Sequence, residues 1–167
     1  MKIKIQFLLT FSMLTIFLSS CLSTKLTRVD DKFTGETTFY SSTLTGFLTA
    51  TIPAAIVVSK TIKSNGENIF IINLNAESSI LNTDCEGVII LFTDGSKLQF
   101  PNAKIDVSSG SGANWSYRSN IVINEEQVDL FVKKKVDAIR LYLYDRHLLE
   151  TERENLPIIF KKMINAQ

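Results

Sequence analysis

The sequence predicts an α+β fold: an antiparallel-rich sheet of about six to eight strands, one late helix and a short C-terminal helix. Three observations predict it. Short runs rich in Val, Ile, Thr, Phe and Tyr, separated by turn signals, fill the first two-thirds of the chain. A strand–helix–strand–helix order then ends it. With 167 residues, 45% of them hydrophobic, the chain is large enough to bury one core, and we expect residues 32–167 to form a single α+β domain.

The first 20 residues form a segment of their own. Lys2 and Lys4 give a basic start, an apolar run follows over residues 7–18, and small residues come next. This order is typical of a secretory signal peptide. The apolar run is about a dozen residues long, whereas a spanning helix needs about 20. We therefore expect residues 1–20 to be a cleaved signal peptide rather than a permanent membrane span.

The next residues identify the kind of signal. Leu18, Ser19, Ser20 and Cys21 resemble the lipobox of bacterial lipoproteins. The resemblance implies that the Cys21 thiol takes a diacylglycerol, that cleavage occurs just before Cys21, and that the new amino group is acylated, for example by palmitate. Several acyl chains make membrane attachment effectively permanent, whereas one chain is marginal. The alternative is an ordinary signal with a cysteine nearby by chance, but Leu18 is larger than the residue such cleavage prefers.

The net charge and the residues after Cys21 limit which partners and locations we expect. Loss of Lys2 and Lys4 from 18 basic side chains leaves 16 against 17 acidic ones, a net charge of −1. No net field of one sign remains to attract nucleic acid or an anionic membrane. We expect residues 21–31 to be the lipidated cysteine and a tether that sets the domain off the bilayer. Leu22, rather than Asp, follows the cysteine. In lipoproteins of double-membrane bacteria this favours the outer membrane, so we expect a cell-envelope location there.

Strands and turns alternate after the tether. Pro53 separates two strands, and Pro101 is expected to end another. Asn65-Gly66 and Asp94-Gly95 supply the positive φ that tight hairpins need. The strands expected in this part are residues 33–42, 46–52, 55–62, 68–75, 88–92 and 97–100.

The last third mixes strands with helices. Residues 108–112 predict a flexible loop, and residues 115–123 alternate as a strand. Asn124 and Gln127 form a capping-box pattern for a helix that runs from Glu125 to about Lys135. The remaining expected elements are a central strand over 136–144, a turn or helix start over 150–155, and a helix over 156–164 with Pro157 in its first turn.

Few residues suggest chemistry. Cys85 lies between two acidic residues, which disfavour the reactive thiolate, so we expect a buried bystander. With Cys21 lipidated, no disulfide framework or zinc spacing remains. His147 is the only histidine, and Asp145 is placed to orient it. A solvated loop histidine is the simpler interpretation, and no spacing predicts a metal site.

Two surface candidates remain. Lys133-Lys134-Lys135 suits an acidic partner or, more simply, a solvated helix end. Trp115, Tyr117 and Arg118 suit stacking on a glycan or peptide, and core or rim packing explains Trp115 equally well. No glycine-rich phosphate loop or nucleophile elbow occurs. We therefore assign no catalytic, cofactor-binding or metal-binding residue.

The preferred interpretation is a membrane-anchored, non-enzymatic binding or structural module of the envelope. Its expected partners are the membrane, through lipid on Cys21, and an envelope protein or glycan. The alternative is an envelope hydrolase with dispersed catalytic carboxylates. The order of elements also resembles small envelope lipoproteins that open with a segment like Asp31-Lys32-Phe33-Thr34-Gly35, which implies no active residue. A deep pocket around His147 and Asp145 favours the enzyme, and a shallow or filled sheet face favours the module.

Overall fold

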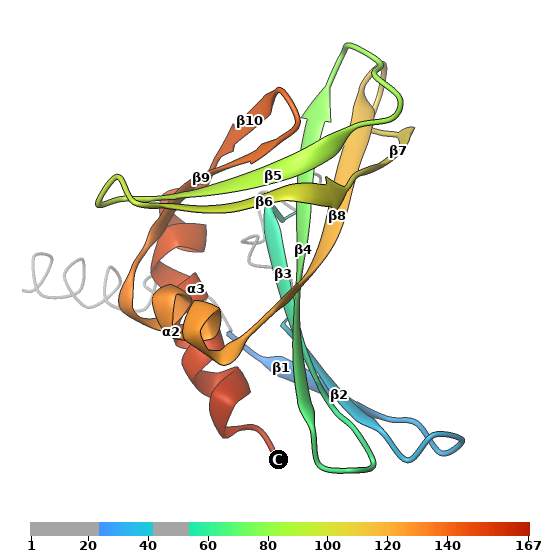
Figure 1. Ribbon diagram of the computed structural model, residues 1–167, viewed down its shortest axis with the longest axis vertical. Coiled ribbons are helices and arrows are strands. Elements are labelled where there is room, and N and C mark those ends of the chain that lie inside the picture. Colours follow the sequence, from blue (N-terminus) through green and yellow to red (C-terminus); the bar gives the residue numbers. More distant parts are fainter. Residues whose placement is uncertain (1–23, 42–53) are drawn as a thin grey trace, which may run out of the picture.

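The computed structural model describes residues 24–41 and 54–167. In that part the α+β prediction is confirmed, with two antiparallel sheets and two helices (Figure 1). In order across the six-stranded sheet lie β1 (Leu26–Asp30), β2 (Thr37–Ser41), β3 (Ile56–Ile62), β4 (Asn68–Ser78), β8 (Trp115–Ile123) and β7 (Asp106–Ser109). The four-stranded sheet holds β10 (Tyr144–His147), β9 (Val136–Leu141), β5 (Glu86–Phe92) and β6 (Lys97–Lys104). The helices are α2 (Glu125–Lys133) and α3 (Glu150–Asn165).

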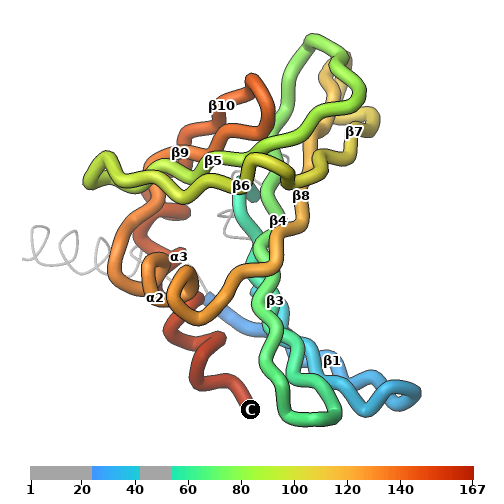
Figure 2. The backbone as a smooth tube through the Cα atoms, in the orientation of Figure 1, coloured from blue at the N-terminus to red at the C-terminus, as the bar shows by residue number. Residues whose placement is uncertain are grey.

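The two sheets and the helices enclose one core. Strands β5, β6 and β9 run across the long strands β4 and β8 (Figure 1). Helices α2 and α3 lie on the same side of the six-stranded sheet, below the four-stranded sheet in the view of Figure 2. The buried side chains form a single cluster that draws on both sheets and both helices. The largest fully buried aromatic side chains are Tyr117, Phe92, Phe131 and Phe160.

Several locally encoded elements are confirmed. The Asn124 side chain accepts a hydrogen bond from the Gln127 backbone at 2.8 Å, and the Gln127 side chain accepts one from the Asn124 backbone at 3.0 Å. This capping box begins α2 as expected. Gly95 has φ of 82° in the β5–β6 hairpin. Phe131 of α2 stacks on Phe160 of α3, with ring centroids 4.7 Å apart.

The start of the domain differs from the prediction. Strand β1 lies inside the segment 21–31 expected to be a tether, and it pairs with β2 from Leu26↔Ser41 to Asp30↔Thr37. Its apolar pattern is weak because it is an edge strand with mostly exposed side chains. The strand expected over 33–42 begins only at Thr37, because a turn precedes it in which Gly35 has φ of 71°. The strand expected over 46–52, and Pro53, lie outside the described residues.

Two proline predictions were wrong. Pro101 does not end β6, which continues to Lys104. An edge strand tolerates proline because one row of its backbone groups needs no partner, and β6 is the edge of its sheet. Pro157 lies in the interior of α3 rather than in its first turn, because the helix already begins at Glu150.

The strand expected over 136–144 is instead a hairpin. Leu141 pairs with Tyr144, so the chain reverses through Tyr142 and Leu143. Tyr142 has φ of 56°, which lies in a region that favours glycine. Because tyrosine occupies this position, the sequence carries no turn signal here. Leu143 is exposed rather than in the core. Strand β9 is central in its sheet, between β10 and β5, as expected.

Candidate functional site

The outward face of the four-stranded sheet carries a small hollow that contains both residues of the His147–Asp145 candidate. The register places Arg140 beside Ile89 on one side and beside Asp145 on the other. In the same way Ala138 lies between Leu91 and His147. The hollow has a volume of about 130 Å³ and is lined by Ile89, Leu91, Lys97, Ala138, Ile139, Arg140, Asp145 and His147.

Asp145 is bound to Arg140 rather than to His147. The Arg140 guanidinium donates to both carboxylate oxygens, through Nε to Oδ1 and through Nη2 to Oδ2, the latter at 2.6 Å. This two-point contact lowers the pKa of Asp145 and raises the pKa of Arg140. Asp145 is therefore a paired carboxylate, and it does not take the role of orienting His147 that its spacing allows. Cross-strand pairing decides the contact, which sequence spacing does not reveal.

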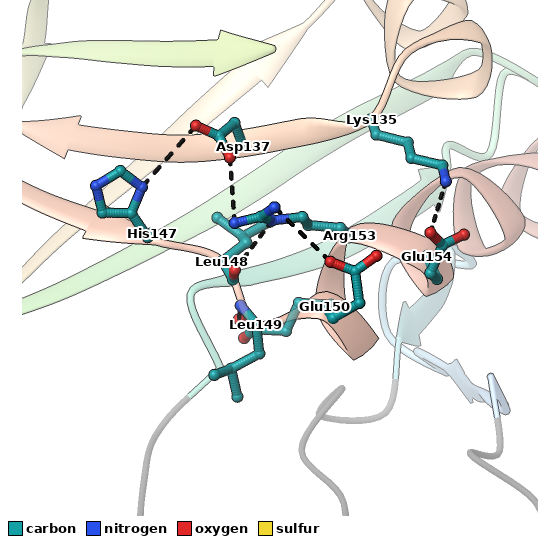
Figure 3. A network of polar contacts seen from close by, with 9 residues as sticks. Lys135, Asp137, His147, Leu148, Leu149, Glu150, Arg153 and Glu154 are labelled. Carbon is teal, nitrogen blue, oxygen red and sulfur yellow. Dashed lines mark hydrogen bonds and ion pairs between the residues drawn. The ribbon is translucent and has the colours of Figure 1, made fainter. Parts of the chain in front are cut away.

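The carboxylate nearest His147 is Asp137, at the start of β9 (Figure 3). The His147 Nδ1 atom lies 3.9 Å from Asp137 Oδ2, which is longer than a hydrogen bond. Asp137 Oδ1 lies 3.1 Å from Nη2 of Arg153, and that guanidinium also lies 3.7 Å from Glu150. The His147 side chain is 74% exposed. The histidine is solvated, as expected, although it lies on β10 rather than in a loop.

The hollow combines an apolar floor with polar edges. Its floor includes the half-buried side chains of Ile89 and Leu91. The Arg140–Asp145 ion pair and Lys97 give it polar edges. An apolar floor with a few oriented polar groups is the usual composition of a binding surface. Sequence analysis did not single out Arg140, Asp137 or Arg153. An alternating strand carries no signal for which cross-strand partners meet.

The other sequence candidates are structural. Cys85 is buried, and its thiol donates to the Asn82 carbonyl at 3.4 Å. Burial, and secondarily Asp84, raise the pKa of Cys85, so the unreactive thiol is favoured. Tyr117 is fully buried. Its hydroxyl donates to the Ile80 carbonyl at 2.6 Å and accepts from the Asn82 backbone at 2.9 Å.

The stacking surface that the sequence offered as one alternative around Trp115 does not form as a set. Tyr117 packs on Tyr144 in the interior, with ring centroids 4.4 Å apart, and is not available to a ligand. Trp115 is half-buried, and Arg118 is exposed. Tyr117 instead holds the β4–β5 loop onto the sheet. Tyr117 lies on the buried face of β8, which it shares with Ser119, Ile121 and Ile123.

The three lysines at the end of α2 are each paired with a carboxylate. Lys133 contacts Asp129 at 2.9 Å, Lys134 contacts Asp94 at 2.8 Å, and Lys135 contacts Glu154 at 2.5 Å. The Lys134 side chain is only 32% exposed. Lys133 is a solvated side chain at a helix end, as expected, whereas Lys134 is partly buried. With each charge already paired, this segment is not an open basic site.

Glu152 and Arg146 form a buried polar cluster that no sequence pattern predicted. Glu152 is almost fully buried and accepts hydrogen bonds from the Ala55 and Leu149 backbones, both at 2.9 Å. Arg146 donates to the Asn75 carbonyl at 3.2 Å and lies 3.9 Å from Glu152. These contacts join α3, β10 and β4 with the residues just before β3. The cluster is a structural junction, and its only sequence signal is a glutamate near a helix start.

Comparisons with known proteins give no relative: no protein-family model, curated protein or solved structure matches the chain. Among the residues that the structure describes, no group of three or more His, Cys, Asp or Glu side chains is placed to hold a metal ion. Neither described helix is long and apolar enough to cross a membrane. Cys21 lies outside the described residues.

Proposed function

We propose that this chain is an envelope lipoprotein held to a membrane by lipid on Cys21, and that its domain is a non-enzymatic binding or structural module. The observation that carries the proposal is the sequence Leu18-Ser19-Ser20-Cys21 after a basic start and a short apolar run. Leu22 after the cysteine favours the outer membrane where the source has one.

The described domain supports a module over the hydrolase alternative. The hollow that contains His147 and Asp145 is small, at about 130 Å³. Asp145 is bound by Arg140 and Asp137 by Arg153. A general acid or base must be free to exchange a proton with substrate, and in both residues the carboxylate oxygens are already engaged by an arginine side chain. The outward face of the four-stranded sheet is the surface on which we place an envelope protein or glycan.

Fatty-acid labelling of cells tests the anchor. Wild-type protein should take the label, and Cys21→Ser should not. Cys85→Ser is the matched control, because Cys85 is buried in the domain and should leave labelling unchanged. Equal labelling of the wild type and the Cys21→Ser variant would refute the lipoprotein proposal.

Capture from envelope extract tests the module. The lipidated wild-type protein should retain a protein or glycan that Arg140→Glu loses, because reversing this charge breaks the Asp145 pair at the edge of the hollow. Lys133→Glu, on the solvated side of α2, is the control and should retain the partner. Glycan hydrolysis that Asp145→Asn abolishes would favour the enzyme instead.

A further inference from the structure

The surface around the first described residue lies beside the C-terminal half of α3. Thr24, at the start of the described chain, accepts hydrogen bonds from the Lys162 ammonium through its carbonyl oxygen, at 2.8 Å, and through its hydroxyl. Figure 1 shows the beginning of β1 next to α3. A broad, open depression of about 550 Å³ lies at this junction. Its lining includes Lys25, Ile158, Lys161 and Lys162, which we call the anchor-side surface.

The anchor-side surface is basic and includes an exposed apolar residue. Lys25, Lys161 and Lys162 are all exposed, and no Asp or Glu is among the described residues that line the depression. Ile158 is 45% exposed in the middle of α3. Lysines around a partly exposed isoleucine suit the interface of an anionic bilayer, which attracts cations and accepts shallow apolar side chains.

The length of the connecting chain places this surface at the membrane. Three residue steps join Cys21 to Thr24, and a fully extended chain covers at most about 11 Å over that distance. If Cys21 carries the lipid, Thr24 cannot lie further than this from the acylated residue. The tether expected over residues 21–31 would have allowed many orientations. Because β1 is part of the sheet and Thr24 is held by Lys162, the orientation is restricted.

We infer that the anchor-side surface docks on the anionic phospholipid headgroups of the membrane that holds Cys21, so that the domain lies against the bilayer in one orientation. This inference rests on the proposed lipid anchor. Each lysine close to an anionic surface favours attachment by about fivefold. The lipid keeps the surface at high local concentration, so a weak contact of this kind is sufficient. The outward face of the four-stranded sheet is then left to other partners.

Lysine footprinting on vesicles tests the inference. The full-length lipidated protein is placed in vesicles of phosphatidylcholine alone or of phosphatidylcholine with phosphatidylglycerol. A membrane-impermeant amine reagent then reports the reactivity of each lysine by mass spectrometry. Lys25 and Lys161 should react several-fold more slowly in the anionic vesicles, and high salt should abolish the difference. Lys97 and Lys104, both on β6, should react equally in the two vesicle types.

A charge-reversal variant makes the test specific. Lys161→Glu should remove most of the protection at Lys25, whereas Lys104→Glu, on the edge strand of the other sheet, should leave it intact. Wild-type protein that carries lipid and sediments with vesicles, yet shows equal Lys25 reactivity in neutral and anionic membranes, would overturn the docking inference and leave the lipoprotein proposal standing. Protection that appears only on adding envelope protein would likewise overturn it, in favour of a protein partner. Protein without lipid by intact mass would instead refute the anchor.

Discussion

At the scale of single residues, Lys134 connects the end of α2 to the β5–β6 turn. Its ammonium lies 2.8 Å from Asp94 and 2.9 Å from the Ser96 hydroxyl, and 5.8 Å from the centroid of the Phe92 ring. A solvated helix end, the simpler sequence-based interpretation of this segment, predicts that Lys134→Ala costs almost no stability. We instead expect it to lower the melting temperature measurably. Lys133→Ala should stay close to wild type because both members of its ion pair are mostly exposed. Equal melting temperatures for the two variants would contradict this role.

The same contact predicts a pH dependence. Hydrogen bonds from Lys134 and Ser96 hold the pKa of Asp94 well below its ordinary value. A carboxyl whose pKa is lowered by folding stabilises the folded state above its unfolded pKa, near 4, and this contribution is lost as the pH falls toward the folded pKa. The stability difference between wild type and Asp94→Asn should therefore be constant near neutrality and shrink below about pH 4. Denaturation at several pH values measures it, and a difference that grows on acidification would contradict it.

Glu152 is the residue whose loss should matter most among the polar side chains. It is buried and accepts from two backbone N–H groups, those of Ala55 and Leu149. Removing a buried acceptor leaves these donors unsatisfied, so Glu152→Ala should destabilise the domain by about 2–4 kcal/mol. Glu152→Gln keeps one acceptor oxygen but turns an NH2 donor toward the other backbone N–H, so it should recover only part of that loss. Glu154→Ala, whose pair with Lys135 is half-exposed, is the control. Urea denaturation measures all three.

At the scale of elements, Phe131 joins α2 to both α3 and the four-stranded sheet. Its ring stacks on the Phe160 ring, and its ring centroid lies 5.7 Å from that of Phe92. Truncating a fully buried phenylalanine costs about 3–5 kcal/mol, so Phe131→Ala should destabilise the domain by that amount. Val132→Ala, at a half-buried position of the same helix, should cost clearly less. An unchanged free energy of unfolding for Phe131→Ala in urea denaturation would contradict the packing of α2.

The elements that the sequence predicts well are those with local causes. The Asn124–Gln127 capping box, the Asp94–Gly95 hairpin and the alternation of β8 each depend on neighbours within a few residues. Strands that depend on cross-strand pairing were either not predicted or, as with residues 136–144, predicted as one strand instead of two. Strands β1 and β7 are edge strands with little apolar pattern. The division into two sheets also has no local signal, because it depends on which strands pair.

The candidate site shows the same limit. Sequence spacing placed Asp145 next to His147, and both do line one hollow. The sequence did not show that Arg140 faces Asp145 across a hairpin, or that Asp137 faces Arg153 of α3. The hairpin reverses at Tyr142, which has a positive φ without being glycine. A tyrosine gives no turn signal, so the register that decides the ion pairs was not predictable.

At the scale of the whole molecule, the two ends of the described chain are held together by polar contacts. Lys162 of α3 holds Thr24, and the Arg28 guanidinium donates to the Gln167 backbone carbonyl at 3.1 Å. Arg28 also lies 5.7 Å from the ring centroid of Phe39. Strand β1 therefore belongs to the folded unit. A domain boundary at residue 32, as the sequence suggested, would leave β2 as an unprotected edge.

Two truncated chains test this boundary and the single core together. A chain that begins at Thr24 should unfold in one cooperative transition, with coincident Trp115 fluorescence and far-UV circular dichroism, because one buried cluster spans both sheets and both helices. Reductant should not change the transition, since Cys85 is a free, buried thiol. A chain that begins at Asp31 should melt at a lower temperature, because it loses the β1–β2 pairing and exposes Phe39. Equal melting temperatures for the two truncated chains would mean that β1 contributes no stability and belongs to the tether. Separate fluorescence and dichroism transitions would mean that the two sheets are independent folding units.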